Sequence, residues 1–150
     1  MTRIFIGADS AGFELKEQIK AHLCEAGYEV SDVGTDSTAS CHYPIFAAAV
    51  ARGVQETEGA LGILVCGTGI GMSMAANKFT GIRAAVCGDT FSARMTRMHN
   101  DANVLCIGAR VIGQGLAKDI VDLFVTTDFE GGRHATRVEM IAKLEAGEEI

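Results

Sequence analysis

The most constraining feature of the sequence is an apolar segment that ends in a glycine-rich turn. Residues 60–66 form a continuous apolar run, which is typical of a strand buried on both faces of a parallel sheet. Gly67, Gly69 and Gly71 follow directly, and a segment rich in helix formers occupies residues 72–79. A strand, a turn with few Cβ atoms and the start of a helix together place several free backbone N–H groups at one point. The segment therefore predicts an anion-binding site.

Cys66 lies where the apolar run meets this turn. A cysteine beside the start of a helix has its pKa lowered from about 8.5 toward the thiolate form, so we expect a reactive thiol here. Cysteines in strands are more often inert core residues, and we interpret Cys87 and Cys106 in this way. Taken alone, the turn matches neither the dinucleotide-binding pattern nor the P-loop, which leaves a simple tight turn as an alternative.

Composition narrows the class of protein. The 150 residues are 48% hydrophobic and 21% charged, with one proline, which is typical of a single globular domain over residues 1–150. A formal net charge of −6 argues against a nucleic-acid partner, and no apolar run approaches the roughly 20 residues of a membrane helix. Five cysteines without a C-x-x-C pair argue against a zinc site. With no visible N-terminal signal, they predict a reducing, cytoplasmic location.

Apolar patterns alternate between strand and helix along the whole chain. Strands are predicted at residues 3–7, 28–33, 60–66, 83–87 and 103–107, and helices around residues 15–26, 46–54, 72–79, 91–98, 116–124 and 138–144. The alternation predicts a Rossmann-like three-layer α/β/α sandwich with a five-stranded parallel sheet, plus a C-terminal helix. Ligands of such sheets bind beyond the carboxyl ends of the strands, where the turn after Cys66 lies.

Several charged residues outside the central turn have both a functional and an ordinary interpretation. Arg133 and Arg137 are four residues apart at the start of the last helix, so they share one face and suit a phosphate group. His134 lies between them and would add a donor. His99 lies between a predicted helix and the next strand, where a lone histidine is more often a cap or a surface residue than a catalyst. Arg110 likewise has the simpler interpretation of a solvated charge.

Together these motifs resemble those of the type B ribose-5-phosphate isomerases and the related galactose-6-phosphate isomerase subunits, over nearly the whole chain. No single motif decides the matter, but their order and spacing are highly specific. The motifs are Gly7-Ala8-Asp9 with Ala11-Gly12 and Leu15-Lys16; His42-Tyr43-Pro44; Cys66 through Gly71 with Ala75-Ala76-Asn77-Lys78; Gly81-Ile82-Arg83; His99-Asn100-Asp101 with Asn103-Val104; Gly108 with Arg110; and Gly131-Gly132-Arg133-His134 with Arg137.

The resemblance implies an aldose–ketose isomerase that interconverts ribose 5-phosphate and ribulose 5-phosphate without a cofactor or a metal. Cys66 would move the proton between C1 and C2 through an enediolate, with the Thr68 hydroxyl beside it. His99, helped by Asp9, would open the furanose ring. The positions that would bind substrate are Ala8, Asp9, Tyr43, Gly67, Thr68, Gly69, Ile70, Gly71, Asn100, Arg110, Arg133 and Arg137.

One residue departs from the pattern of the family. The residue after the first aspartate is usually histidine, whereas this chain has Ser10, which is shorter and carries no charge. Residues 42–46 also lean toward the galactose-6-phosphate subunits. Four-carbon and six-carbon sugar phosphates therefore stay open as substrates of the same chemistry. A non-catalytic sugar-phosphate-binding module is the alternative of another class, although such a binder needs neither Cys66 nor His99.

The expected positions of the site residues predict an assembly. Asp9 and Cys66 follow their strands and so lie at the carboxyl edge of the sheet, whereas His99 precedes the fifth strand and lies at the amino edge. A strand of about five residues separates the two edges by roughly 17 Å, which one chain bridges only if the helix before His99 bends back over the sheet. We therefore expect a homodimer, or a larger even oligomer, in which each subunit lends His99 to the Cys66 site of its neighbour.

Overall fold

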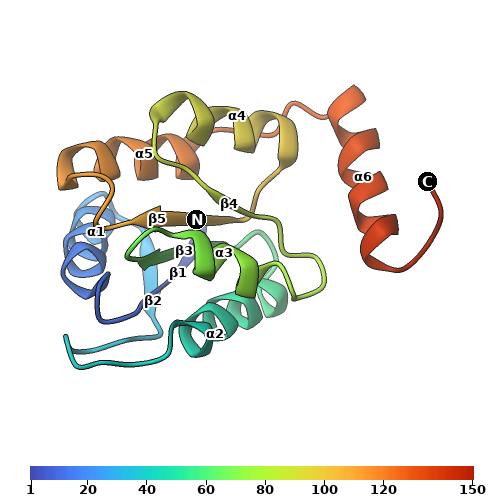
Figure 1. Cartoon of the computed structure of the whole chain (residues 1–150). Helices are drawn as coiled ribbons and strands as arrows, with labels where there is room; N and C mark the ends of the chain where they lie inside the picture. The colour runs from blue at the N-terminus through green and yellow to red at the C-terminus, as the bar shows by residue number, and fades with distance from the viewer.

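The computed structural model describes residues 1–150, and its centre is a five-stranded parallel sheet in the order β2-β1-β3-β5-β4 (Figure 1). The strands are β1 (Arg3–Ala8), β2 (Glu29–Asp32), β3 (Leu61–Cys66), β4 (Ala84–Val86) and β5 (Val104–Gly108). The helices are α1 (Phe13–Glu25), α2 (Tyr43–Glu56), α3 (Ile70–Ala76), α4 (Thr90–Asn100), α5 (Gln114–Thr126) and α6 (Arg133–Glu145). The predicted alternation of strands and helices is confirmed.

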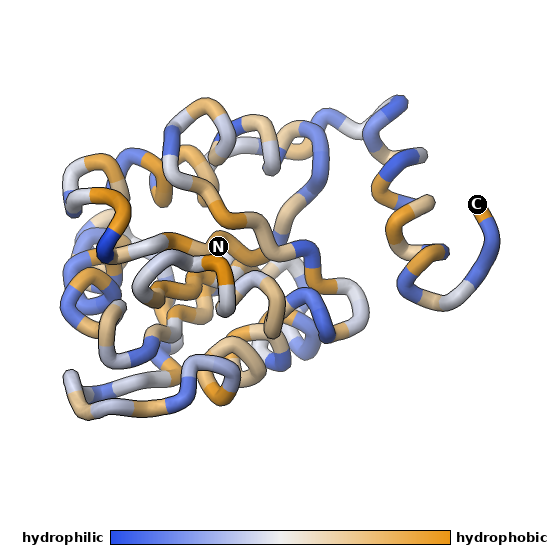
Figure 2. Tube along the Cα trace, in the orientation of Figure 1, coloured by the Kyte–Doolittle hydropathy of each residue, from blue (hydrophilic) through white to orange (hydrophobic).

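Helices cover both faces of the sheet, which confirms the predicted sandwich. Side chains of α1, α4 and α5, such as Ile19 and Phe124, form the apolar core on one face. Side chains of α2 and α3, such as Val50 and Met72, form the core on the other face. All six residues of β3 are buried, because this strand lies in the middle of the sheet with helices on both sides. Figure 2 shows the apolar colour concentrated in these central strands.

The register places the ends of β1 and β3 side by side. Ala8 pairs with Val65, and Cys66 pairs with Gly108 of β5. The strand order reverses here, because β2 lies beyond β1 on one side while β5 and β4 lie beyond β3 on the other. A reversal of this kind opens a crevice outside the carboxyl ends of the two strands. Asp9 and Cys66 lie at the edges of this crevice.

The chain enters α3 earlier than the sequence suggests. The helix begins at Ile70 rather than at residue 72, because Gly69 has a φ of 81° and turns the backbone directly into the helix. It ends at Ala76 rather than at residue 79. The amide of Asn77 pairs instead with the backbone of Ala84, at 3.0 Å through its Nδ2 and 2.8 Å through its Oδ1, and so ties the end of α3 to the start of β4.

Helix α6 stands away from the sandwich (Figure 1). It packs chiefly against α4, and Glu145 near its end accepts the N–H of Gly81 at 2.9 Å. Its apolar residues face no other part of the chain fully: Ile141 is 48% exposed and Leu144 is 58% exposed. None of the helices combines the length and the apolar character that crossing a bilayer demands.

Candidate active site

Cys66 is the last residue of β3, and its side chain is buried at the start of the glycine-rich turn. The N–H of Gly69 donates a hydrogen bond to the Cys66 Sγ at 3.0 Å. The left-handed conformation of Gly69 aims this N–H back at the sulfur, a conformation that residues with a side chain adopt only at a cost. The turn therefore places a polar donor on the sulfur atom.

The other two strand cysteines lie in the core. Burial, with a contribution from Asp89, raises the pKa of Cys87 to about 11, and burial also raises the pKa of Cys106. Both therefore stay protonated thiols near neutral pH, which agrees with their interpretation as inert.

Several backbone donors of the turn have no partner. The N–H groups of Gly67, Thr68 and Gly71 donate to no acceptor within the chain, whereas the N–H of Ile70 donates to the Thr68 hydroxyl at 3.3 Å. Thr68 itself is exposed. Free N–H groups on one short turn are suited to an oxyanion.

The loop after β1 lies directly on the end of β3. The N–H of Asp9 donates to the Val65 carbonyl at 3.2 Å, and the Asp9 Oδ1 accepts the N–H of Gly12 at 3.0 Å. A Cβ atom on Gly12 would overlap the Val65 carbonyl, so this approach needs glycine. Ala8 is fully buried, and both its N–H and its carbonyl bond to the chain at Gly34 and Thr35. Asp9 is therefore held at the edge where Cys66 ends its strand.

Tyr43 and Arg110 complete this edge. The Tyr43 ring lies against Gly71, where a Cβ atom would come within 2.6 Å of the ring carbons. The Arg110 side chain lies beside Gly67, 3.6 Å from the position of a Cβ atom there, and the backbone N–H of Arg110 donates to the Gly67 carbonyl at 3.1 Å. The structure thus brings Asp9, Tyr43 and Arg110 to the turn after Cys66.

Four expected site residues lie at the opposite edge: His99, Asn100, Arg133 and Arg137. His99 and Asn100 end α4, and the carbonyl of Asn100 accepts a hydrogen bond from Arg83 just before β4 begins, at 3.1 Å. β5 runs from this amino edge to Gly108 beside Cys66, which places the two edges about 13 Å apart. Arg133 and Arg137 are exposed at the start of α6. One chain therefore does not bring these residues to Cys66.

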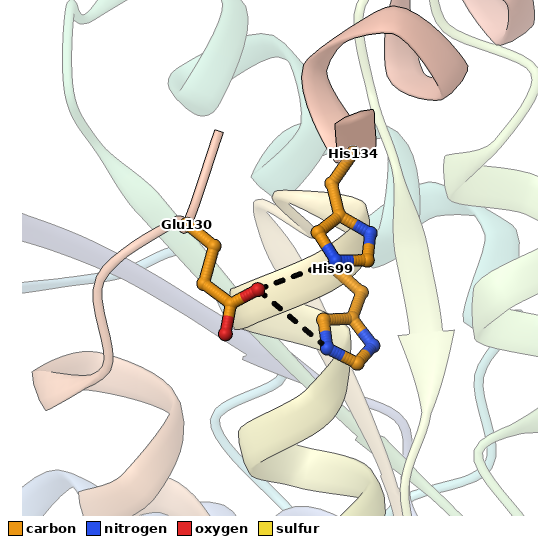
Figure 3. Close-up of side chains that lie close together, drawn as sticks. All are labelled: His99, Glu130 and His134. Atoms are coloured by element: carbon orange, nitrogen blue, oxygen red, sulfur yellow. Dashed lines mark ion pairs between the residues drawn. The ribbon is translucent and has the colours of Figure 1, made fainter. Parts of the chain in front are cut away.

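At this second edge, His99 and His134 form a stacked pair with Glu130 beside them (Figure 3). The ring centroids are 4.1 Å apart and the planes differ by 9°. Burial, followed by the proximity of His99 and of Arg133, lowers the pKa of His134. Sequence reasoning did not single out Glu130. The available signal was its position four residues before His134. The two glycines between them, Gly131 and Gly132, both have positive φ.

Known proteins of similar sequence are named as sugar-phosphate isomerases. Residues 4–141 match the family described as Ribose/Galactose Isomerase. The chain is 52% identical to ribose-5-phosphate isomerase B of Escherichia coli, with 97% of each protein covered. It is 46% identical to D-erythrulose-4-phosphate isomerase of Pectobacterium atrosepticum, with 97% of this chain and 96% of that protein covered.

Two solved structures extend the likeness to three dimensions. Ribose-5-phosphate isomerase B of Clostridium thermocellum matches with a TM-score of 0.96 at 51% identity, over 97% of this chain and 99% of that one. Ribose-5-phosphate isomerase B of Mycoplasma genitalium, solved with bound ribulose-5-phosphate, matches with a TM-score of 0.93 at 41% identity, over 97% of each chain.

Proposed function

The chain belongs to the ribose/galactose isomerase family, and from this premise we propose that it interconverts ribose 5-phosphate and ribulose 5-phosphate with Cys66 as the catalytic base. The family makes it a sugar-phosphate aldose–ketose isomerase. A relative named for the pentose reaction is 52% identical, and a solved relative holds ribulose-5-phosphate. One observation carries the assignment of the base: the Cys66 sulfur ends β3 beneath the N–H of Gly69.

The turn supplies what the reaction needs. Isomerisation of an aldose removes the proton from C2 and returns a proton to C1, and negative charge develops on an oxygen of the enediolate. In this proposal the Cys66 thiolate takes and returns the proton. The free N–H groups of Gly67, Thr68 and Gly71 bind the enediolate oxygen. A preorganised donor of this kind contributes roughly 3 to 4 kcal/mol to lowering the barrier.

The residues of the second edge act, in this proposal, from a second copy of the chain. His99 opens the furanose ring by moving the proton of the C1 hydroxyl to the ring oxygen, with help from Asp9 of the first edge. Arg133 and Arg137 bind the phosphate as paired guanidinium groups, and Asn100 binds substrate hydroxyls. The exposure of both arginines and of Asn100 leaves them available to a neighbouring subunit.

A four-carbon sugar phosphate is the second candidate substrate. Ser10 replaces the histidine usual in the family, next to Asp9 at the crevice. The relative from P. atrosepticum is named for erythrulose 4-phosphate and is 46% identical, which supports this candidate. The base and the oxyanion donors serve both substrates, because the proton transfer is the same. The two candidates differ only in the length of the sugar and in the need for ring opening.

Replacement of the base tests the proposal. Cys66→Ser keeps the shape of the side chain, but an alcohol is too weak an acid to act as the base, so we expect kcat to fall at least about 100-fold. Binding of ribose 5-phosphate, measured by calorimetry, should stay close to that of the unmodified protein. Cys24→Ser is the matched control, because Cys24 is exposed on α1 outside the site. Retention of more than about a tenth of kcat by Cys66→Ser would contradict the assignment.

A substrate screen separates the two candidates. Four-, five- and six-carbon aldose and ketose phosphates would be compared by kcat/KM for the unmodified protein and for Ser10→His. We expect the pentose phosphate to be turned over best. A preference for the tetrose phosphate that Ser10→His shifts toward the pentose would instead favour the four-carbon candidate.

A further inference from the structure

His99, Glu130 and His134 bring three metal-binding side chains together, and we propose that they bind a divalent transition ion of the zinc type. One ligand atom from each residue lies within 4.8 Å of the other two. Figure 3 shows both imidazole rings presenting a nitrogen to the Glu130 carboxylate. Two imidazole nitrogens and one carboxylate oxygen form a set that suits Zn²⁺ and leaves a coordination position open. The isomerase reaction requires no such set.

The distances are close to those of a coordinated ion. Two ligand atoms on a tetrahedral Zn²⁺ lie about 3.3 Å apart, given metal–ligand bonds of about 2.0 to 2.1 Å. His134 Nε2 already lies 3.2 Å from Glu130 Oε2, and His99 Nε2 lies 3.9 Å from the same oxygen. Binding would require the two rings to tilt out of their parallel stack until both nitrogens converge. The His99 side chain is 37% exposed at the end of α4 and has room for this movement.

His134 supplies an independent reason for a ligand here. Its Nε2 is buried and makes no hydrogen bond, although it lies at ion-pair distance from Glu130. Buried polar atoms nearly always have a hydrogen-bond partner, so this unsatisfied nitrogen keeps its capacity to bind a ligand. The nitrogen faces the Glu130 carboxylate, so an ion bound by both would lie to one side of the line that joins the two atoms (Figure 3).

The surrounding charges permit a cation. Glu130 is the only carboxylate within ion-pair distance of either ring. Arg133 and Arg137 oppose a cation, but both side chains are exposed, so solvent and salt screen their charge. The sequence does not predict this site, because its three ligands come from separate places: the end of α4, the loop before α6 and the first turn of α6.

Occupancy of this site would act on the proposed reaction through His99. A nitrogen lone pair that coordinates a metal cannot accept a proton, so a bound ion would prevent His99 from opening the ring. The metal is thus expected to inhibit the enzyme reversibly rather than to assist it. The binding itself does not depend on the proposed function.

Calorimetric titration of the untagged protein with ZnCl₂ tests the site. We expect one Zn²⁺ per chain, with affinity at least about 100-fold weaker in His134→Ala and clearly weaker in Glu130→Gln. Glu130 is exposed, so the second variant is expected to fold even if the first is disturbed. His22→Ala is the matched control and should bind normally, because His22 pairs with Asp122 at 2.7 Å on α1, outside the cluster.

The free thiols are the competing ligands. CoCl₂ should give the visible spectrum of a nitrogen- and oxygen-bound ion without a sulfur charge-transfer band, in the unmodified protein and in Cys66→Ser alike. Unchanged Zn²⁺ affinity in both cluster variants, or a sulfur band that Cys66→Ser removes, would overturn the proposal.

Activity measurements separate the site from the reaction. ZnCl₂ should lower the turnover of ribose 5-phosphate, and a chelator should restore it. If calorimetry shows Zn²⁺ on these three residues but turnover is unaffected, the metal site stands and the ring-opening role of His99 is wrong.

Discussion

Gly12 lies where the loop after β1 packs against the end of β3. Its N–H holds the Asp9 carboxylate, and its Cα lies directly over the Val65 carbonyl at the end of β3. Its φ is −95°, so backbone conformation does not require glycine and only the lack of space does. The position of Asp9 therefore depends on one missing methyl group.

We predict that Gly12→Ala lowers the free energy of unfolding by about 1 to 3 kcal/mol, because the added Cβ forces the loop away from β3. Turnover should fall as well, since Asp9 moves with the loop. Urea denaturation and steady-state kinetics would measure the two effects. Gly115→Ala is the control: a Cβ there meets nothing within 4 Å, and stability should stay equal or rise by up to about 1 kcal/mol. Equal stability of the two variants would show that the loop has room.

Site residues could be predicted from the sequence when the residues that act together are close in the chain. Cys66 and the glycine turn are adjacent in the chain, so the strand, the turn and the helix start were readable together. Glu130 became visible only in the structure, because its partner His99 is 31 positions earlier in the sequence and reaches it through the packing of α6 on α4.

Among the elements, α1 is joined to the loop after β2 by a buried charge. Lys16 of α1 is 1% exposed, and its Nζ lies 2.7 Å and 2.8 Å from the two carboxylate oxygens of Asp32 and 2.6 Å from the Thr35 carbonyl. Burial opposes ionisation of Asp32, but hydrogen bonds from Lys16 and Lys20 outweigh it and lower the pKa of Asp32. Asp32 thus keeps the ammonium group of Lys16 compensated.

We predict that Asp32→Asn lowers the free energy of unfolding by about 3 kcal/mol at pH 7, because it leaves Lys16 charged and poorly compensated. The pKa of Asp32 is lower in the folded than in the unfolded chain, so its contribution is fully present above pH 4 or so and is lost as the pH falls through the folded value. The difference in free energy of unfolding between the unmodified protein and Asp32→Asn should therefore shrink as the pH falls.

Denaturant titrations between pH 7 and pH 3 would measure this gap. Asp36→Asn makes the same chemical change at an exposed residue that takes part in no ion pair, and it should have little effect at any pH. A gap for Asp32→Asn that persists unchanged at pH 3 would mean that packing, rather than charge, accounts for it.

The elements were predictable where apolar periodicity was strong, and their ends were not. Residues 60–66 read as a buried strand because β3 is covered on both faces. The boundaries of α3 depend on the φ of Gly69 and on the pairing of Asn77 with Ala84. The spacing of apolar residues predicts neither of them.

In the whole molecule, the two halves of the candidate site lie at opposite edges of the sheet. The half with Cys66 lies at the crevice, and the half with His99 lies beside α6, which stands off from the sandwich (Figure 1). Ile141 and Leu144 of α6 line a groove of about 520 Å³ against Ile82 and Ala84, and both α6 residues are largely exposed. An exposed apolar face of this kind is a candidate surface for a second copy of the chain, which is what the proposed sharing of His99 and Cys66 requires.

Complementation of two inactive proteins tests this assembly. We predict that Cys66→Ser and His99→Ala, denatured together in equal amounts and refolded, regain about a quarter of the unmodified activity, because about half of the dimers are mixed and each has one intact site. Size-exclusion chromatography would establish that dimers form. The double variant mixed with either parent is the control and should stay inactive. Mixed dimers as inactive as their parents would place each site within one chain.

The separation of α6 from the sandwich has a consequence for how such an enzyme responds to dilution. If every working site is assembled from two chains, catalysis follows the law of mass action for the subunits as well as for the sugar. Activity per milligram would then stay constant at high enzyme concentration and fall steeply once the concentration drops below the subunit dissociation constant. The amount of protein in a compartment, and not only its intrinsic rate, would decide whether the sugar is isomerised at all.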